Sequence, residues 1–217
     1  MDFIPEFAAY LKDKHKLPDM WALKVSATVY ASMLDRHVWI QTFRGPNRLN
    51  VWNVVLAPSG KGKSVVWDLD IIPILINVGR RLDRSIILPS VASSFEGLTD
   101  WANEYGLKGI ILRDEITTFF KESRAGYTAT VQETYSKLYD GWILPRATRT
   151  VRIKSPIPVY VNLLGGATPN YFYDQMGAEF FFQGCGNRFD FELWRGKSDS
   201  LEPSEMFPDA NVMDLYR

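Results

Sequence analysis

Continuous apolar runs alternate with amphipathic segments along this chain. The predicted buried strands are 49–56, with its apolar run at 51–56, then 85–88, the three aliphatic residues 110–112, and 158–164. Helical periodicity is predicted over 63–81, with a break or bend near Pro73, and from Ser93 to about Glu104, where Gly106 can end the helix. This alternation of strand and helix predicts an α/β fold with a mainly parallel central sheet.

An N-terminal segment with helical periodicity precedes these strands. Apolar residues recur at helical spacing over 3–11, and a broad apolar face runs over 20–34 after a break at Pro18. We expect these helices to pack beside the sheet. Residues 38–43 are a candidate short strand, and 45–47 (Gly-Pro-Asn) are expected to form a turn.

A loop rich in glycine and lysine joins the run 49–56 to the helix that follows. It reads APSGKGKS and matches the phosphate-loop pattern G-x-x-x-x-G-K-[ST], with Ala57 in place of the first glycine. Gly60 and Gly62 let backbone N–H groups approach a polyphosphate without an intervening Cβ, and the helix start adds its positive dipole end. Lys63 can then reach the β- and γ-phosphates, and the Ser64 hydroxyl can bind Mg²⁺.

The predicted ATP-binding residues are Ala57, Pro58, Ser59, Gly60, Lys61, Gly62, Lys63, Ser64 and Val65. The alternative interpretation is a chance Gly/Lys loop between a strand and a helix.

The aliphatic run 110–112 is followed, after Arg113, by a pair of carboxylates, Asp114 and Glu115. The carboxyl end of a buried parallel strand faces the ligand crevice of the sheet. At that position Asp114 can hold Mg²⁺ through water, and Glu115 can polarise an attacking water. Such a pair alone is also typical of a solvated strand end. Because it follows the phosphate loop by about 50 residues, with a strand–helix unit between, it favours hydrolysis.

Residues 116–157 form an excursion before the next core strand. Short helices are predicted at 117–121 and 128–139, and the second half of 142–154 alternates basic or polar with apolar residues, as a hairpin strand does. This stretch carries four cations and no acid, namely Arg146, Arg149, Arg152 and Lys154. They indicate either an exposed ribbon with a solvated face or a contact for the phosphate backbone of nucleic acid.

The run 158–164 is followed by GGATPN, where Pro169 can open a helix at its first position. A polar side chain at this strand tip can position the lytic water and sense the γ-phosphate. Thr168 is the first choice for this role and Asn162 the second. Arg188 precedes an alternating strand, and two interpretations stay open for it. It is either a cation that completes a neighbouring subunit's site or a member of a structural ion pair.

Composition limits the classes of protein to be considered. The chain has 217 residues, a hydrophobic fraction of 46% and equal numbers of basic and acidic residues, 25 each, so any nucleic-acid binding must come from a local patch. Its single cysteine, Cys185, fits a reducing compartment and is expected to be a small buried filler. No apolar run approaches a membrane span, and the N-terminus lacks the basic region of a secretory signal, so we expect a cytoplasmic location.

Four motifs, APSGKGKS, GIILRDE, LLGGATPN and GNRFDFELW, resemble in order and spacing the nucleotide-binding core of AAA+ and RecA-type P-loop ATPases. The YDGW sequence and the Arg-rich stretch before the third motif are similar to helicase-like ATPases of plasmids, phages and archaeal viruses. The resemblance covers 48–195. It implies a three-layer α/β P-loop NTPase core, preceded by an N-terminal helical segment (1–47) and followed by an acidic polar tail (196–217).

This resemblance implies binding and hydrolytic roles for Lys63, Ser64, Asp114 and Glu115, a γ-phosphate sensor role for Thr168 and a trans-acting role for Arg188. The sequence departs from the family at Ala57 and lacks an evident C-terminal helical lid. We therefore expect a neighbouring subunit in a homo-oligomeric ring, or a partner protein, to complete the site.

The expected function is a nucleic-acid motor that hydrolyses ATP with Mg²⁺ and contacts DNA, as a helicase or translocase does. A viral genome-packaging ATPase would use the same chemistry. A slow nucleotide-dependent switch or scaffold is the alternative from another class, and the Asp114–Glu115 pair argues against it. A small-molecule kinase is a further possibility, disfavoured by the same pair.

Overall fold

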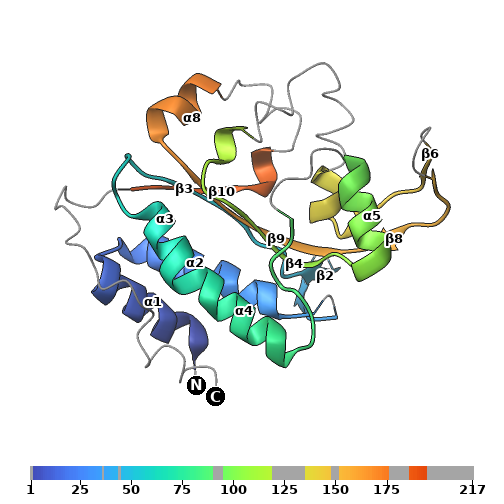
Figure 1. The fold of residues 1–217 in the computed structure, drawn as a ribbon, viewed down its shortest axis with the longest axis horizontal. Coiled ribbons are helices and arrows are strands. Elements are labelled where there is room, and N and C mark those ends of the chain that lie inside the picture. The colour runs from blue at the N-terminus through green and yellow to red at the C-terminus, as the bar shows by residue number, and fades with distance from the viewer. Residues whose placement is uncertain are drawn as a thin grey trace.

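The structure is a computed structural model that describes residues 2–35, 37–43, 45–89, 95–118, 135–147, 152–175 and 186–194. Residues 95–99, 146–147 and 152–153 are described by their backbone alone. A central sheet runs through the molecule, with helices on both of its faces (Figure 1). The predicted α/β class with a parallel sheet is confirmed.

The central sheet has four strands in the order β10-β3-β9-β4, and every neighbouring pair is parallel. The strands are β3 (Trp52–Leu56), β4 (Lys108–Arg113), β9 (Tyr160–Ala167) and β10 (Asp190–Leu193). Strand β9 is inserted between β3 and β4, although it follows both in the chain. The main strands of the predicted sheet are thus confirmed as parallel neighbours.

The predicted strand 85–88 is reduced to a single parallel bridge between Ile87 and Ile110 beyond β4. Leu88 N donates to Ile110 O and Ile110 N donates to Ile86 O, each at 2.8 Å. The approach is so close that a Cβ on Gly109, whose φ is +151°, would lie 1.9 Å from Ile86 O. Glycine at position 109 is therefore what lets this fifth segment reach the sheet.

One face of the sheet is covered by α1 (Phe3–His15), α2 (Asp19–Met33) and the helix that follows the phosphate loop. Phe7, Leu11 and Trp21 from α1 and α2 are fully buried, and they share one apolar cluster with Val55, Ile110 and Leu112 of the sheet. The N-terminal helices thus rest on the same core as the strands.

The helix after the phosphate loop changes its hydrogen-bond pattern midway. It begins as α3 (Lys63–Val66), passes through a π-helical turn (Trp67–Ile71) and continues as α4 (Ile72–Arg81). Pro73 lacks an N–H and its ring would clash with the carbonyl four residues before it, so the preceding turn opens to a wider pattern. The predicted break near Pro73 is therefore a π-turn that leaves the helix continuous.

Asp70 in this π-turn is a buried carboxylate that ties the phosphate-loop helix to α1. His15 Nε2 donates to its Oδ2, Tyr10 Oη donates to its Oδ1 at 2.8 Å, and Lys14 Nζ lies 3.0 Å from the same oxygen. Burial alone would raise the pKa of Asp70, but these hydrogen bonds and charges hold that pKa below its ordinary value. The carboxylate therefore stays charged, and its contacts hold α1 against the helix that follows the loop.

The other face carries α5 (Phe95–Tyr105), a short helical stretch at 135–139 and α8 (Pro169–Gln175). Ala102, Leu138 and Phe172 from these segments join Trp52 and Leu163 of the sheet in a second apolar cluster. Pro169 opens α8 as predicted, and Gly106, with a φ of +73°, follows the end of α5 as predicted. Ser93 of the proposed helix start lies outside the described residues.

Several two-stranded ribbons surround the amino ends of the central strands. Strands β1 (Trp39–Thr42) and β2 (Gly45–Arg48) form an antiparallel hairpin, so the predicted turn at 45–47 is wrong. Pro46 is tolerated in β2 because a ribbon edge does not need its missing N–H. In the excursion, β5 (Trp142–Ile143) pairs with β8 (Ile157–Pro158), and β6 (Arg146–Ala147) pairs with β7 (Arg152–Ile153). The predicted basic hairpin is thus present.

Within the described part of the chain, no helix is both long enough and apolar enough to cross a lipid bilayer. The predicted short helices at 117–121 and 128–139 fall mostly outside the described residues, as do Cys185 and the predicted tail at 196–217.

Candidate functional site

The carboxyl ends of three adjacent strands bring the predicted chemistry together. The register pairs Leu56 with Ala167 and Arg113 with Gly165, so β3, β9 and β4 end side by side. The phosphate loop follows β3, Thr168 follows β9, and the Asp114–Glu115 pair follows β4. Figure 1 shows these ends next to the start of α3 and of α8. Segments far apart in sequence thus share one edge of the sheet.

The predicted phosphate loop (57–64) curls between β3 and α3 through two left-handed glycines. Gly60 has φ +77° and Gly62 has φ +74°, conformations that side chains with a Cβ rarely adopt. A Cβ built on Gly60 would meet nothing within 4 Å, so this part of the loop faces open space. Ala57, at the position of the usual first glycine, is fully buried, and its N–H donates to Ala167 O at 3.0 Å.

Lys63 lies across the loop that precedes it. Its Nζ donates to Ala57 O at 2.6 Å and to Pro58 O at 3.2 Å. Burial lowers the pKa of Lys63, while the nearby carboxylates of Glu115 and Asp114 act in the opposite direction. The ammonium group thus lies at the mouth of the loop, where the carboxylates of Asp114 and Glu115 act on its charge.

Ser64 and Asp114 are in direct contact although 50 residues separate them in the chain. Ser64 Oγ donates to Asp114 Oδ2 at 2.8 Å. A hydroxyl and a carboxylate oxygen are hard ligands of the kind that Mg²⁺ prefers. The two predicted metal-binding residues are therefore adjacent, at the start of α3 and the end of β4.

Glu115 is oriented by a residue that the sequence analysis did not single out. Thr117 Oγ1 donates to Glu115 Oε1, and Thr117 N donates to the same oxygen at 3.3 Å. Thr117 is fully buried, while the Glu115 side chain is half-buried and Asp114 is exposed. A hydroxyl residue two positions after a carboxylate is a local signal for such a contact. Thr117 thus restrains one of the two carboxylate oxygens of Glu115.

The tip of β9 is packed against both halves of the site. The strand continues through Gly165, Gly166 and Ala167, which the sequence analysis placed after its end. A Cβ on Gly166 would lie 2.8 Å from Asp114 O and 3.2 Å from Lys63 Cδ. Two successive glycines in a strand indicate close approach of a neighbour. Here they let the Asp114 backbone and the Lys63 side chain meet over the strand.

Thr168 follows this tip directly, and its carbonyl accepts a hydrogen bond from Phe172 N at 2.9 Å at the start of α8. It is partly exposed at the edge that carries the phosphate loop. Asn162, the second choice, lies elsewhere. Asn162 Oδ1 accepts from Val51 N at 2.8 Å and its Nδ2 donates to Gly109 O at 3.3 Å, deep in the sheet. Asn162 is therefore a structural residue that links the strands.

Arg188 lies near the amino ends of the central strands, away from the predicted phosphate loop. It lies in a short 3-10 turn (Gly186–Arg188) before β10, whose Asp190 pairs with Asn53 near the start of β3. Its guanidinium donates to Asp140 Oδ1 at 3.2 Å and lies over the Tyr139 ring. Arg188 is thus not brought to the phosphate loop of its own chain, and the structural ion pair that was one interpretation is present.

The predicted nucleic-acid contacts lie partly outside the described side chains. The backbone of Arg146 and Arg152 is in the antiparallel pair β6–β7, where Arg146 is opposite Ile153. Lys154 is exposed, and Arg149 lies outside the described residues. The strand β6 lies beyond β8, on the side where the central strands begin (Figure 1).

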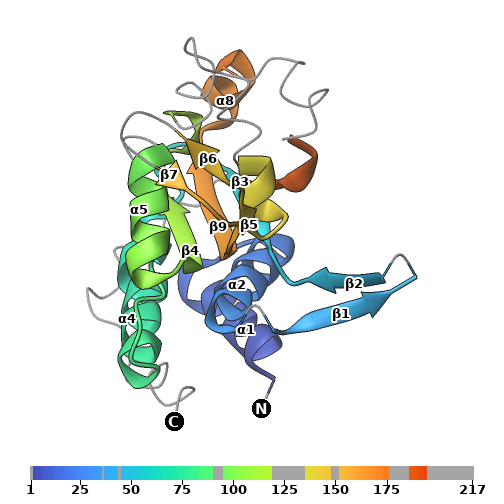
Figure 2. The same ribbon diagram turned by 90° about the vertical axis from the view of Figure 1, so that its right-hand side faces the viewer.

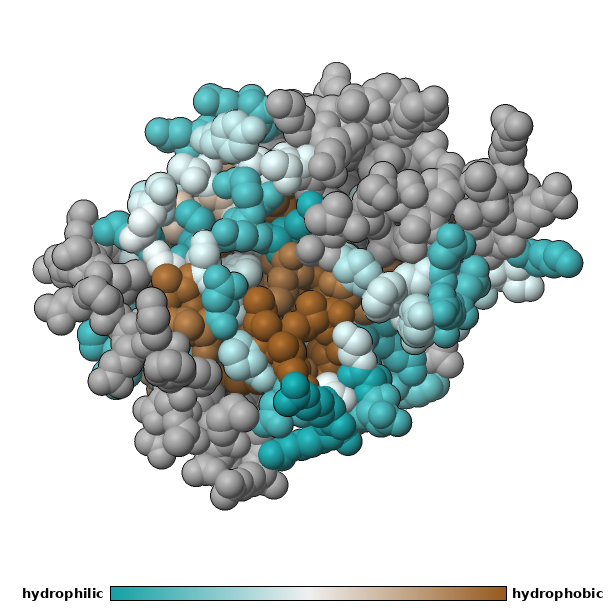
Figure 3. Space-filling model, viewed as in Figure 1, coloured by the Kyte–Doolittle hydropathy of each residue, from teal (hydrophilic) through white to brown (hydrophobic). Residues whose placement is uncertain are grey.

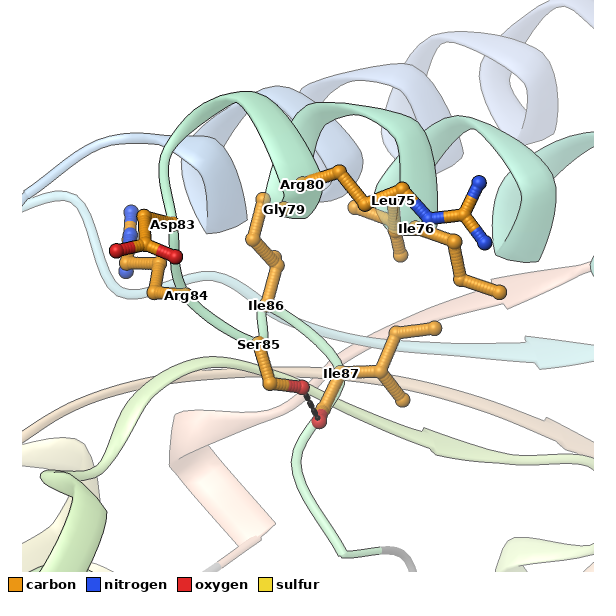
Figure 4. Close-up of a pocket in the computed structure, with 9 residues that line it drawn as sticks. All are labelled: Leu75, Ile76, Gly79, Arg80, Asp83, Arg84, Ser85, Ile86 and Ile87. Carbon is orange, nitrogen blue, oxygen red and sulfur yellow. Dashed lines mark hydrogen bonds between the residues drawn. The ribbon is translucent and has the colours of Figure 1, made fainter.

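An open hollow of about 450 Å³ lies on the β4 side of the sheet, between the end of α4 and the segment 85–87 (Figure 4). Ile76, Ile86 and Ile87 give it an apolar floor, and Ser85 Oγ donates to Ile87 O at 2.8 Å. Figure 3 shows an apolar area beside α4 on this face. The lining of the hollow begins at Leu75, about 18 Å along the helix from Lys63, so the hollow is not part of the predicted site.

No protein-family model matches the chain, and a search of curated proteins finds no match either. The geometry of the site and the motifs themselves are therefore what bears on function.

Proposed function

We propose that this chain is a P-loop ATPase that hydrolyses the γ-phosphate of ATP with Mg²⁺ and applies this reaction to nucleic acid as a helicase- or translocase-like motor. The observation that supports this most is the 2.8 Å contact between Ser64 and Asp114, with Lys63 beside the same strand tips. A loop pattern alone predicts phosphate binding. An acidic residue in contact with the end of that loop is what metal-assisted hydrolysis requires in addition.

The residues fit a magnesium ion shared with a polyphosphate. Among the described residues, no group of three or more His, Cys, Asp or Glu side chains is placed to hold a metal ion. Mg²⁺ at phosphate-transfer sites is held by one or two protein oxygens together with the substrate's own phosphates. Ser64 and Asp114 would supply these oxygens, and the ion would neutralise charge on the phosphates.

The side chains of this chain have separate tasks in the proposed reaction. The N–H groups of the loop and the Lys63 ammonium bind the phosphates, and Lys63 exchanges its contacts with Ala57 O and Pro58 O for phosphate oxygens. Glu115, held at one oxygen by Thr117, orients a water for in-line attack and accepts its proton. Thr168 is placed at the tip between the loop and the carboxylates, where a hydroxyl can contact the γ-phosphate or that water.

Glu115→Gln separates binding from hydrolysis. We expect this variant to bind ATP with the affinity of the wild-type chain and to lose hydrolysis by about 100-fold or more, because it removes the base and leaves the loop intact. Steady-state phosphate release, run beside a binding titration with a fluorescent ATP analogue, measures both. If Glu115→Gln hydrolyses ATP as fast as the wild-type chain, Glu115 is not the base and the proposal fails.

The nucleic-acid part of the proposal is supported by the antiparallel pairing of β6 (Arg146–Ala147) with β7 (Arg152–Ile153) in the Arg-rich stretch. Hydrolysis should therefore be faster with single- or double-stranded DNA, and charge reversal or neutralisation of Arg146, Arg149 and Arg152 should weaken DNA binding. A chain whose hydrolysis is indifferent to nucleic acid would instead support the switch or scaffold alternative.

A further inference from the structure

The hairpin β1–β2 is unusual for the large apolar side chains that it exposes. Phe43 at its turn is 93% exposed, Trp39 is 55% exposed and Ile40 is 54% exposed. Figure 2 shows this hairpin standing away from the body of the molecule, beyond α2. Isolated two-stranded ribbons are marginally stable, and contiguous exposed apolar surface marks a contact site. This ribbon therefore presents its aromatic rings for something other than the chain's own core.

The charge of the same segment is one-sided. Residues 36–48 contain Arg36, Arg44 and Arg48, together with His37, and no acidic residue. The nearest acid, Asp35, is engaged by Lys108 Nζ at 3.2 Å and lies 3.8 Å from His37. In a chain whose formal net charge is zero, this is a local excess of cations with aromatic residues among them. That combination is typical of surfaces that bind the phosphates and stack the bases of a single strand.

Arg48 joins this hairpin to the base of the second ribbon. Its Nη1 donates to Gly141 O at 3.0 Å and to Val159 O at 3.2 Å, and its guanidinium lies 5.4 Å from the centre of the Trp142 ring. Gly141 has φ +88°, and a Cβ there would lie 1.8 Å from Arg48 Nη1. The root of β1–β2 is thus held next to β5–β8, the ladder from which the basic hairpin β6–β7 extends.

We propose that β1–β2 is a single-strand binding element, in which Trp39 and Phe43 stack on unpaired bases while cations of the two joined hairpins contact the phosphate backbone. This inference deepens the proposed function, since it names single-stranded nucleic acid as the substrate class of the motor. The contact with the single strand would lie where the central strands begin, at the end of the sheet opposite the predicted phosphate loop.

The charge of the segment favours nucleic acid over a protein partner or a second copy of the chain. A two-fold dimer formed through this hairpin would place the cationic segments of two copies together, and like charges at such an interface oppose binding. A nucleic acid strand has both the π faces that the rings require and the negative charge that complements the arginines.

The test is fluorescence anisotropy of the full chain with labelled 20-mer oligothymidine, oligouridine and a 20-bp DNA duplex, without nucleotide. We expect binding of the single strands in preference to the duplex, and preference between the two single strands decides between DNA and RNA. The double variant Trp39→Ala/Phe43→Ala should lose about 5- to 150-fold in affinity per ring. Its salt dependence should keep the wild-type slope, because no phosphate contact is removed.

Matched variants separate stacking from other effects. Tyr173→Ala removes a ring that is 60% exposed on α8, at the other edge of the sheet, and should bind as the wild-type chain does. Trp39→Phe should retain most of the affinity and Trp39→Leu should lose it, because leucine keeps apolar area without a stacking face. Circular dichroism of each variant reports whether it is folded.

Wild-type affinity in the double variant, or equal affinity of Trp39→Leu and Trp39→Phe, would overturn the proposal. A dimer that becomes a monomer in the double variant, measured by light scattering, would do so as well and would assign the hairpin to self-association. Because binding is measured without ATP, the two proposals fail separately. Oligonucleotide binding without any ATP hydrolysis would contradict the proposed function and leave this inference standing.

Discussion

The central sheet has a carboxyl edge, where its strands end, and an amino edge, where they begin. These two edges hold their polar and aromatic side chains in different ways. At the carboxyl edge the polar side chains are restrained by neighbours: Ser64 contacts Asp114, and Thr117 holds Glu115. At the amino edge the prominent side chains are long, and Phe43 and Trp39 are largely exposed on a ribbon. The side chains of the carboxyl edge are thus held in fixed positions. Those of the amino edge are exposed and available to an external partner.

The difference has a structural cause. Each residue of the carboxyl edge follows a strand whose register in the sheet is set by buried apolar residues, so its position is inherited from the core. Among the described residues, strands β1 and β2 at the amino edge pair only with each other, and Arg48 links them to the backbone of Gly141 and Val159. Substitutions at the first edge should therefore change chemistry and stability, and substitutions at the second should change binding alone.

The largest effect is expected from Lys63→Ala. The Lys63 ammonium lies at the mouth of the loop near both carboxylates, and in the proposed reaction its loss would remove a charge that stabilises the transferred phosphoryl group. Hydrolysis should fall by about 10²- to 10³-fold, and ATP affinity should fall with it. Steady-state hydrolysis and ATP titration measure these two quantities. Wild-type turnover in the Lys63→Ala variant would contradict the proposal that hydrolysis takes place at the carboxyl edge.

A smaller effect, on stability, is expected from Asp70→Asn. The amide cannot balance Lys14 and His15 as the carboxylate does, so we expect a loss of about 2–3 kcal/mol in the free energy of unfolding. The folded pKa of Asp70 is depressed. Its contribution is therefore fully present above the unfolded pKa of about 3.9 and is lost as pH falls through the folded pKa.

Urea denaturation of both chains at pH 7 and across pH 5 to 2 checks the Asp70 prediction. The difference between the two chains should shrink as the pH falls. A difference that is the same at both ends of this range would show that the charge of Asp70 does not hold α1 to the loop helix.

Gly166→Ala tests how tightly the strand tip is packed. The new Cβ would lie 2.8 Å from Asp114 O, so the carboxylate strand or the Lys63 side chain must shift. We expect about 1–3 kcal/mol of destabilisation together with slower hydrolysis. Gly60→Ala, where no atom lies within 4 Å of the Cβ, is the control for crowding, although its φ of +77° adds backbone strain. Equal stability of Gly166→Ala and the wild-type chain would show that the tip is loosely packed.

The smallest effect on stability is expected at the amino edge. Trp39→Ala and Phe43→Ala should change the free energy of unfolding by about 0.5 kcal/mol or less, because both rings are mostly exposed in the folded chain. Chemical denaturation measures this. A loss comparable to that of a buried aromatic residue would mean that the rings pack on the body in solution, and the contrast between the two edges would disappear.

The residues of the carboxyl edge could be predicted because each follows a continuous apolar run, and parallel strands end at a common edge. Ser64 and Asp114 were paired on that basis, and they are in contact. The order of the strands could not be read in the same way. Strand β9 lies between β3 and β4 through long-range pairing that no local pattern of the sequence records.

Features that depend on tertiary contacts were missed or misplaced. The glycines of β9 were placed in a loop, although they remain in the strand because Ile116 and Lys63 pack against them. The turn at 45–47 was wrong because Pro46 occupies a ribbon edge instead. The exposure of Phe43 could not be inferred either, since an aromatic residue in an apolar stretch is expected to be buried.

The most direct test of the central claim is hydrolysis of ATP with Mg²⁺ by the wild-type chain, Ser64→Ala, Asp114→Asn and the double variant. We expect measurable turnover for the wild-type chain. We also expect that the double variant loses less than the product of the two single losses, with a coupling of about 0.5–3 kcal/mol, because both side chains hold one ion. Absence of wild-type turnover, or single losses that simply multiply, would contradict a shared magnesium site at this edge of the sheet.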